Sequence, residues 1–199
     1  ISSIQGKDLE VTKRGDKIIV SMLAGVTIDI LRDALGHGSD FIRIMPNTPV
    51  ALGQGVCALY ADKQTQERAR AQVDALMQPL GLVEWMTDEA QFNLITALTG
   101  CGPAFVFRFI DALGAAAAEL GLESTQAARL ALATVQGAAS LASASDRTPA
   151  ALADAVASPG GMTREGLNVM DEGGRLYSLM LDVLRAAEAR GEALARGAK

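Results

Sequence analysis

The sequence "DKIIVSMLAGVTIDILRDALG", residues 16–36, places a strand, a short turn and a helix in immediate succession. Its first part, Asp16–Met22, is a β-branched run of the kind found in buried parallel strands. Val26–Gly36 then has helical spacing, with Ile28, Leu31 and Leu35 on one side and a glycine as the stop signal. A strand that leads directly into a helix predicts a parallel α/β sheet.

The same alternation continues downstream. Three further strands are predicted, at Asp40–Met45, Gly55–Ala61 and Leu82–Met86, and an amphipathic helix ends near Gly81. Strands at this spacing, alternating with helices, indicate a mainly parallel sheet.

After Thr87 the strand signals stop. We predict a helix from Asp88 to about Thr99, capped by its first residue. Long helices follow at Ala104–Leu120 and Ser124–Ala144, and the remainder of the chain is also helical, including one helix that Thr148 caps. Because this region is rich in Ala and Gly, its helices can approach closely, and we expect helices of two chains to interlock.

Composition excludes several classes of function. The chain of 199 residues is 49% apolar, and its 18 basic and 23 acidic residues give a net charge of −5. Without a Lys/Arg cluster, neither nucleic acid nor an anionic membrane is an expected partner. A single histidine and two isolated cysteines exclude the common zinc sites, so no metal is expected, and a reducing cytoplasm is the simplest setting.

Neither a membrane span nor a signal peptide is predicted. The uncharged stretch Ala90–Phe107 is interrupted by "TGCGP", and Leu130–Ser145 is short and contains several serines. The first residues, "ISSIQGKDLEV", have no basic start, no apolar run and no initiator Met. We therefore expect the sequence to begin inside a longer protein.

Two loops at strand ends are candidates for ligand contacts. In "SMLAGV", Ser21–Val26, small residues follow a buried strand, where open sheets bind ligands. In "MPNTPV", Met45–Val50, two prolines stiffen a loop that could hold the Asn47 carboxamide against a ligand. Both are also consistent with ordinary structural turns.

A third candidate is "ASPGGMT", Ala157–Thr163. The amides of Gly160, Gly161 and Met162 fall at the start of a predicted helix, where backbone N–H groups lack partners and the helix dipole favours an anion. Such a group of unpartnered backbone amides fits a carboxylate or a phosphate, although an ordinary capped helix start remains the alternative. Glu89, considered alone, is interpreted as a solvated acid or one that a helix dipole favours.

The motifs in their order closely resemble the pyrroline-5-carboxylate reductase family, through "SMLAGVTI", "IRIMPNTPVALGQGV", "ITALTGCGPAFVF" and "SPGGMTREGLNVMDEGG". The resemblance implies α/β plus all-α architecture: part of a Rossmann-type domain over 1–87 and a helical substrate-binding and dimerisation domain over 88–199. It further implies reduction of 1-pyrroline-5-carboxylate to L-proline by hydride transfer from NADPH or NADH, in a homodimer or larger homo-oligomer.

The resemblance also assigns site residues. For the cofactor these are Met22, Leu23, Ala24, Gly25, Pro46, Asn47 and Thr48. For the substrate they are Glu89, Thr96, Ser158, Gly160, Gly161, Met162 and Thr163. The glycine loop would hold the substrate carboxylate, and the catalytic hydroxyl of Thr163 would lie near the ring nitrogen.

The sequence departs from the family pattern in places. Leu23 stands where Ala is usual, Cys101 replaces a serine, Met162 replaces Thr or Ala, and Ala155 replaces a common polar cofactor contact. No G-x-G-x-x-G fingerprint occurs, so the opening strand and the phosphate-binding turn are expected upstream of Ile1.

Two alternatives remain open. One is a non-catalytic dimerising module without a cofactor half. The other is a related imine or β-hydroxyacid reductase, although the hydroxyacid enzymes are expected to carry a catalytic lysine that residues 88–99 lack. The sequence leaves the choice between NADP and NAD undecided.

Overall fold

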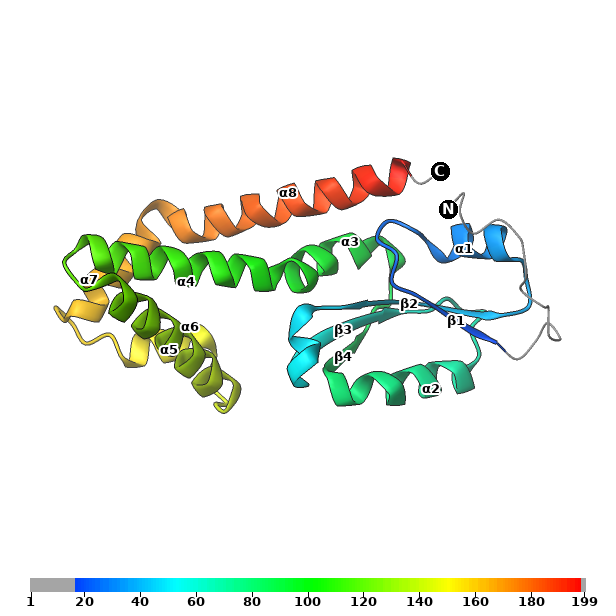
Figure 1. Cartoon of the computed structure of the whole chain (residues 1–199), viewed down its shortest axis with the longest axis horizontal. Coiled ribbons are helices and arrows are strands. Elements are labelled where there is room, and N and C mark those ends of the chain that lie inside the picture. Colours follow the sequence, from blue (N-terminus) through cyan, green and yellow to red (C-terminus); the bar gives the residue numbers. More distant parts are fainter. Residues whose placement is uncertain (1–16, 198–199) are drawn as a thin grey trace. The chain divides into compact units, whose positions relative to one another are not determined.

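The computed structural model describes residues 17–197 (Figure 1). Within this range the chain forms two compact units, one made of residues 17–103 and 183–197 and the other of residues 104–182. The division does not follow the predicted domain boundary after residue 87, because the first helical segments after the sheet contact β2 and β3, and the end of the last helix approaches Gly25 and Asn93.

A four-stranded sheet in the order β1-β2-β3-β4 forms the centre of the first unit. Its strands are β1 Ile18–Ser21, β2 Asp40–Pro46, β3 Gly55–Tyr60 and β4 Gly81–Trp85. β1 and β2 are parallel, as are β3 and β4, which confirms the mainly parallel sheet. β2 and β3 are antiparallel because the short 3₁₀ turn η1, Thr48–Leu52, replaces a crossover helix between them.

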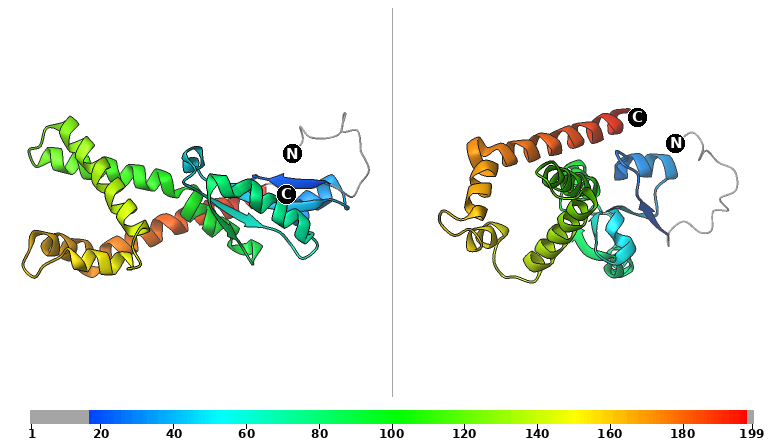
Figure 2. Two further views of the ribbon diagram at one scale, coloured as in Figure 1. Left: turned by 90° about the horizontal axis from the view of Figure 1, so that it is seen from below. Right: turned by 60° about the vertical axis from the view of Figure 1, so that its left-hand side comes forward.

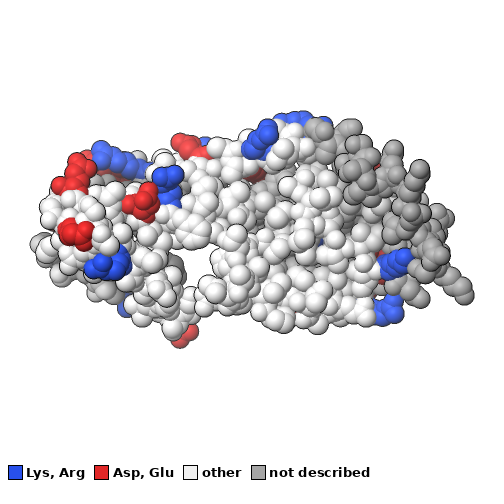
Figure 3. Space-filling view, viewed as in Figure 1, with Lys and Arg blue, Asp and Glu red and all other residues white. Residues whose placement is uncertain are grey.

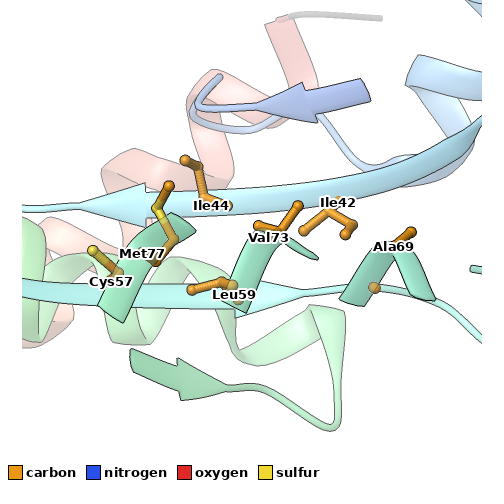
Figure 4. Close-up of a cluster of buried hydrophobic side chains, with 8 residues drawn as sticks. Ile42, Ile44, Cys57, Leu59, Ala69, Val73 and Met77 are labelled. Carbon is orange, nitrogen blue, oxygen red and sulfur yellow. The ribbon is translucent and has the colours of Figure 1, made fainter. Parts of the chain in front are cut away.

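Helices α1, Ile28–Leu35, and α2, Glu67–Met77, cover opposite faces of the sheet (Figure 1). Alternate residues of β2 supply both cores, because successive side chains of a strand point to opposite faces. On one face Phe41 packs with α1. The other face packs on α2 and contains Ile42, Ile44, Cys57, Leu59, Ala69, Val73 and Met77 (Figure 4). Burial raises the pKa of the Cys57 thiol, which therefore stays protonated.

The segment after the sheet is not the single helix that the sequence predicts. It consists of a 3₁₀ turn η3, Glu89–Gln91, the short helix α3, Phe92–Ile95, and a π-helical turn η4, Thr96–Gly100. Asp88 caps it as predicted, because its side chain accepts a hydrogen bond from the Ala90 amide at 2.9 Å. The π turn is closed by the bond from Cys101 N to Thr96 O at 3.0 Å, five residues back.

The helices after the π turn follow the predicted ranges closely. They are α4 Gly102–Glu119, α5 Ser124–Ser143, α6 Pro149–Ala155, α7 Met162–Asp171 and α8 Arg175–Gly197, with a 3₁₀ turn η5, Glu172–Gly174, before the last (Figure 2). The Thr148 hydroxyl accepts from Ala151 N, which confirms the predicted cap. A Cβ added to Gly114 would lie 3.2 Å from Ala128 Cα, so α4 and α5 pack closely through small residues.

Much of the helical surface is apolar. Phe107, Ile110 and Leu132 line a groove of about 640 Å³ between α4 and α5. In the view of Figure 3, uncharged residues cover much of these helices, and charged side chains occur in small groups. By length and composition alone, the helical stretch Glu89–Glu119 would suffice to cross a bilayer, which the sequence prediction did not anticipate. Exposed apolar surface of this kind is typical of an interaction site.

Candidate functional site

The two predicted cofactor segments lie at the same edge of the sheet. Met22–Gly25 directly follows β1, while Pro46 ends β2 and Asn47 and Thr48 follow it. Because β1 and β2 are parallel, their carboxyl ends meet at one edge, where open α/β sheets bind ligands. Met22 and Leu23 are exposed there, at 62% and 48%.

Gly25 is fixed by a close approach of the C-terminal helix. Its φ of +74° lies in the left-handed region. A Cβ added to it would lie 2.8 Å from the backbone Cα of Ala195 in α8, closer than such atoms approach. No larger residue fits this position, and the sequence offered no sign that residue 195 contacts the turn.

Both the nitrogen and the oxygen of the Asn47 carboxamide form hydrogen bonds within the chain. Its Nδ2 donates to Thr99 O at 3.0 Å, and its Oδ1 accepts from Val56 N at 2.8 Å. The side chain therefore ties the loop to β3 and to the π turn. The predicted contact of this carboxamide with a cofactor remains a prediction.

The hydroxyls of Thr96 and Thr99 each donate a hydrogen bond to the backbone carbonyl four residues earlier. Thr96 Oγ1 donates to Phe92 O at 2.6 Å, and Thr99 Oγ1 donates to Ile95 O at 2.8 Å. Such back-bonding bends helices, and here it accompanies the π turn. The Thr96 hydroxyl could still accept a hydrogen bond from a ligand.

Glu89 is not the solvated acid that its sequence context alone suggests. Only 20% of its side chain is exposed, and its Oε1 accepts two hydrogen bonds. One comes from the backbone N of Ile28, the first residue of α1, at 2.9 Å. The other comes from Arg43 Nη1, also at 2.9 Å. The carboxylate thus connects η3, α1 and β2.

Arg43 is a functional candidate that sequence reasoning missed. Its side chain is 3% exposed, and its guanidinium lies over the ring of Phe92, 4.1 Å from the centroid. Its Nε has no hydrogen-bond partner among the described residues. The available signal was an arginine between the apolar residues Ile42 and Ile44 of the strand "DFIRIM".

A small cavity of about 210 Å³ adjoins these groups. It is lined by Gly25, Thr27, Arg43, Glu89, Ala90, Asn93 and Ala195. Nearby on β3, burial and then the negative charges of Glu89 and Asp62 raise the pKa of Tyr60 above its usual value.

The glycine loop contains fewer free amides than the sequence predicts. Gly161 N donates to Ser158 O at 3.0 Å in a turn that Gly160 permits with its φ of +68°. The expectation that the Gly161 amide is available to an anion is therefore wrong. Gly160 N and Met162 N have no partner among the described residues, and Met162 begins α7.

The side chains around this loop are open to solvent. Ser158 and Thr163 are exposed, and Met162 is 94% exposed. Of the predicted substrate residues, Glu89 and Thr96 belong to the first unit, together with the cofactor segments, and 158–163 belong to the second.

Comparison with known proteins identifies relatives over most of the chain. Residues 89–194 match the family model for pyrroline-5-carboxylate reductase dimerisation. The chain is 39% identical over 171 residues to the pyrroline-5-carboxylate reductase of Aquifex aeolicus, covering 86% of this chain and 64% of the relative. It is 37% identical over 180 residues to that of Pseudomonas aeruginosa, covering 90% and 66%.

Solved structures agree with this result. A pyrroline-5-carboxylate reductase from Coxiella burnetii matches with a TM-score of 0.84 at 35% identity, over 89% of this chain and 66% of that one. A Plasmodium falciparum pyrroline carboxylate reductase with NADP bound matches with a TM-score of 0.79 at 28% identity, over 90% and 68%. The chain spans less than two thirds of the length of the Aquifex and Pseudomonas relatives.

Proposed function

Because this chain belongs to the pyrroline-5-carboxylate reductase family, we propose that the protein reduces 1-pyrroline-5-carboxylate to L-proline with NADPH or NADH. The observation that carries the proposal is the sheet edge at the ends of β1 and β2. There, the two predicted cofactor segments lie together, in a chain whose helical region matches the family's dimerisation model.

The residues at this edge fit the nicotinamide end of a cofactor. Ala24 is small and exposed, so a flat ring could approach the main chain there, whereas the space beside Gly25 is filled by Ala195 of α8. When bound, the cofactor supplies a hydride. We assign Met22–Gly25 and Pro46–Thr48 to holding it, whereas a phosphate-binding fingerprint does not occur within the sequence.

For the substrate, we assign the glycine loop to the carboxylate. The amides of Gly160 and Met162 can donate to it, at the N-terminus of α7 where the helix dipole favours an anion. A fixed carboxylate fixes the orientation of the ring and hence the face that receives the hydride. As the imine carbon gains hydride, the C=N electron pair moves to the protonated ring nitrogen, and the Thr163 hydroxyl can accept a hydrogen bond from the amine that forms.

We further propose that residues 88–199 form a homodimer. The exposed apolar groove between α4 and α5 is surface that a second copy would cover. The same partner would account for the apolar stretch Glu89–Glu119 without a membrane. The two free cysteines fit a reducing cytoplasm, and net negative charge without basic clusters argues against nucleic acid as a partner.

The test is a reductase assay on the full-length protein. Loss of dihydronicotinamide absorbance with 1-pyrroline-5-carboxylate, and formation of L-proline, are the expected results, and NADPH and NADH are compared in parallel. Titration of cofactor fluorescence distinguishes the enzyme from a non-catalytic dimerising module, which would give no response. Oxidation of a β-hydroxyacid instead of imine reduction would identify the related hydroxyacid enzymes.

A further inference from the structure

Arg43 occupies an unusual place for a charged residue. It lies in β2, which has neighbours on both sides in the sheet, and its side chain is 3% exposed. Alternation along the strand puts it on the same face as Phe41, the face that α1 covers. A cation in such a place is stable only when it is paired, and here a single carboxylate pairs with it.

The guanidinium makes two different contacts to the segment that follows the sheet. Nη1 donates to Glu89 Oε1 at 2.9 Å, and Cζ lies over the Phe92 ring, 4.1 Å from its centroid. The planar guanidinium of an arginine can form an ion pair with a carboxylate and stack on an aromatic ring at the same time, whereas a lysine ammonium lacks the planar stacking surface. Arg43 therefore holds the beginnings of both η3 and α3 against the sheet.

The same carboxylate oxygen anchors α1. Glu89 Oε1 accepts from Ile28 N at 2.9 Å, just after the turn assigned to the cofactor. Glu89 Oε2 receives no hydrogen bond from any residue between 17 and 197. Glu89 and Arg43 also line the cavity of about 210 Å³ beside Gly25. One oxygen is thus committed to structure, while the other remains available.

We infer that Arg43 is a positioning residue for the reaction. It fixes Glu89 so that the second oxygen of this carboxylate, Oε2, is free to bind the substrate. The inference rests on the proposed reductase function. In this role Arg43 acts through Glu89, to which its Nη1 donates a hydrogen bond. The link to Ile28 would in addition keep the carboxylate in register with the cofactor-side turn.

The experiment compares Arg43→Met, Arg43→Lys and Glu89→Gln, alone and combined, in the full-length protein. Arg32→Met is the matched control, because Arg32 is also a largely buried arginine of the same unit, paired with Asp62 and lying 5.7 Å from the centroid of Phe41. It lines a different cavity, with His37 and Thr65. For each variant, kcat, both KM values and Tm are measured.

We expect Arg43→Met to lower kcat at least tenfold, with the KM for NADPH changed less than threefold. Arg43→Lys should recover part of the loss, because it restores the charge but not the stacking. The double variant Arg43→Met/Glu89→Gln should be no slower than Glu89→Gln alone, because residues that act as one unit are not additive. Arg32→Met should lower Tm with kcat retained.

Three results would overturn the inference. One is an equal loss of kcat in Arg32→Met and Arg43→Met, which would indicate a general effect of stability. The second is a double variant whose loss is the product of the two single losses. The third applies if Arg43→Met does not fold: a normal kcat in Arg43→Lys would then exclude the positioning role. A wild-type protein without imine reductase activity would refute the proposed function itself, and the inference with it.

Discussion

The side chain of Asn47 and the main chain of Thr99 are joined by a hydrogen bond that spans 52 residues of sequence, with 3.0 Å between Nδ2 and the carbonyl oxygen. This bond connects the loop after β2 to the π turn. Since the same carboxamide accepts from Val56 N, one side chain fixes three segments around the proposed site.

Replacement of Asn47 should therefore reduce stability as well as activity. Asn47→Asp keeps an acceptor for Val56 N but places a negative oxygen against Thr99 O, and we expect a loss of about 1–3 kcal/mol in the free energy of unfolding. Denaturant titration measures it. Gln64→Glu, the same change of charge at an exposed position, is the control and should change stability by less than about 0.5 kcal/mol. Equal effects would show that the carboxamide bridge does not matter.

Thr163 should affect the chemistry without affecting the fold. Its side chain is exposed, at the second position of α7, and it has no hydrogen bond within the described chain. Thr163→Ala should lower kcat/KM more than tenfold, which is more than about 1.4 kcal/mol. Thr125→Ala, at the second position of α5, is the matched control and should leave kcat/KM unchanged. Near-normal kinetics for Thr163→Ala would remove this residue from the mechanism.

The glycine loop can be tested at its two glycines separately. A Cβ at Gly161 would lie 2.5 Å from Ser158 Oγ, so Gly161→Val must displace the serine. We expect the KM for the imine carboxylate to rise at least tenfold, with the circular dichroism spectrum retained. At Gly160 a Cβ would meet no atom within 4 Å, so Gly160→Ala adds only backbone strain, about 1 kcal/mol. An unchanged KM in Gly161→Val would contradict the assignment of the loop to the carboxylate.

Asp62 gives a pH-dependent contribution to stability. Burial opposes its ionisation, but hydrogen bonds from Arg32 and Thr65 outweigh burial and lower its pKa. A carboxyl whose folded pKa lies below its unfolded value, about 3.9, stabilises the protein above that pH, and the contribution is lost as pH falls through the folded pKa. The difference in unfolding free energy between wild type and Asp62→Asn should thus be largest near neutrality and shrink below about pH 4.

Thermal unfolding at several pH values measures this difference. Asp33→Asn, at an exposed position of α1, serves as the control. A wild-type advantage that stays constant from pH 7 to about pH 2 would show that Asp62 does not titrate in this way.

Much of the fold could be predicted from patterns within short stretches of the sequence. The β-branched run before Ser21, the spacing of Ile28 and Leu31, and the Thr148 cap each specify an element from a few adjacent residues. The antiparallel pairing of β2 with β3 could not be predicted from such local patterns. A loop with two prolines shows that a strand ends but does not show in which direction the next strand runs.

The parts of the site that could not be predicted depend on contacts between distant segments. Arg43 meets Glu89 across 46 residues, and Ala195 reaches Gly25 from the end of α8. No periodicity encodes such pairs. The π turn is likewise bonded by the remote Asn47, which donates to Thr99 O. The bond between Gly161 and Ser158 occurs in a local turn in which Gly160 has a positive φ.

The outer side of β1 has a practical consequence. Within the described range β1 pairs only with β2, and Val20 is 38% exposed. An unpaired strand edge with apolar side chains is a template for further strands, supplied by the same polypeptide or by a neighbouring molecule. If no further strand covers this edge, intermolecular β-association and clouding of concentrated samples are the expected result. Charged substitutions along this edge would be the first remedy.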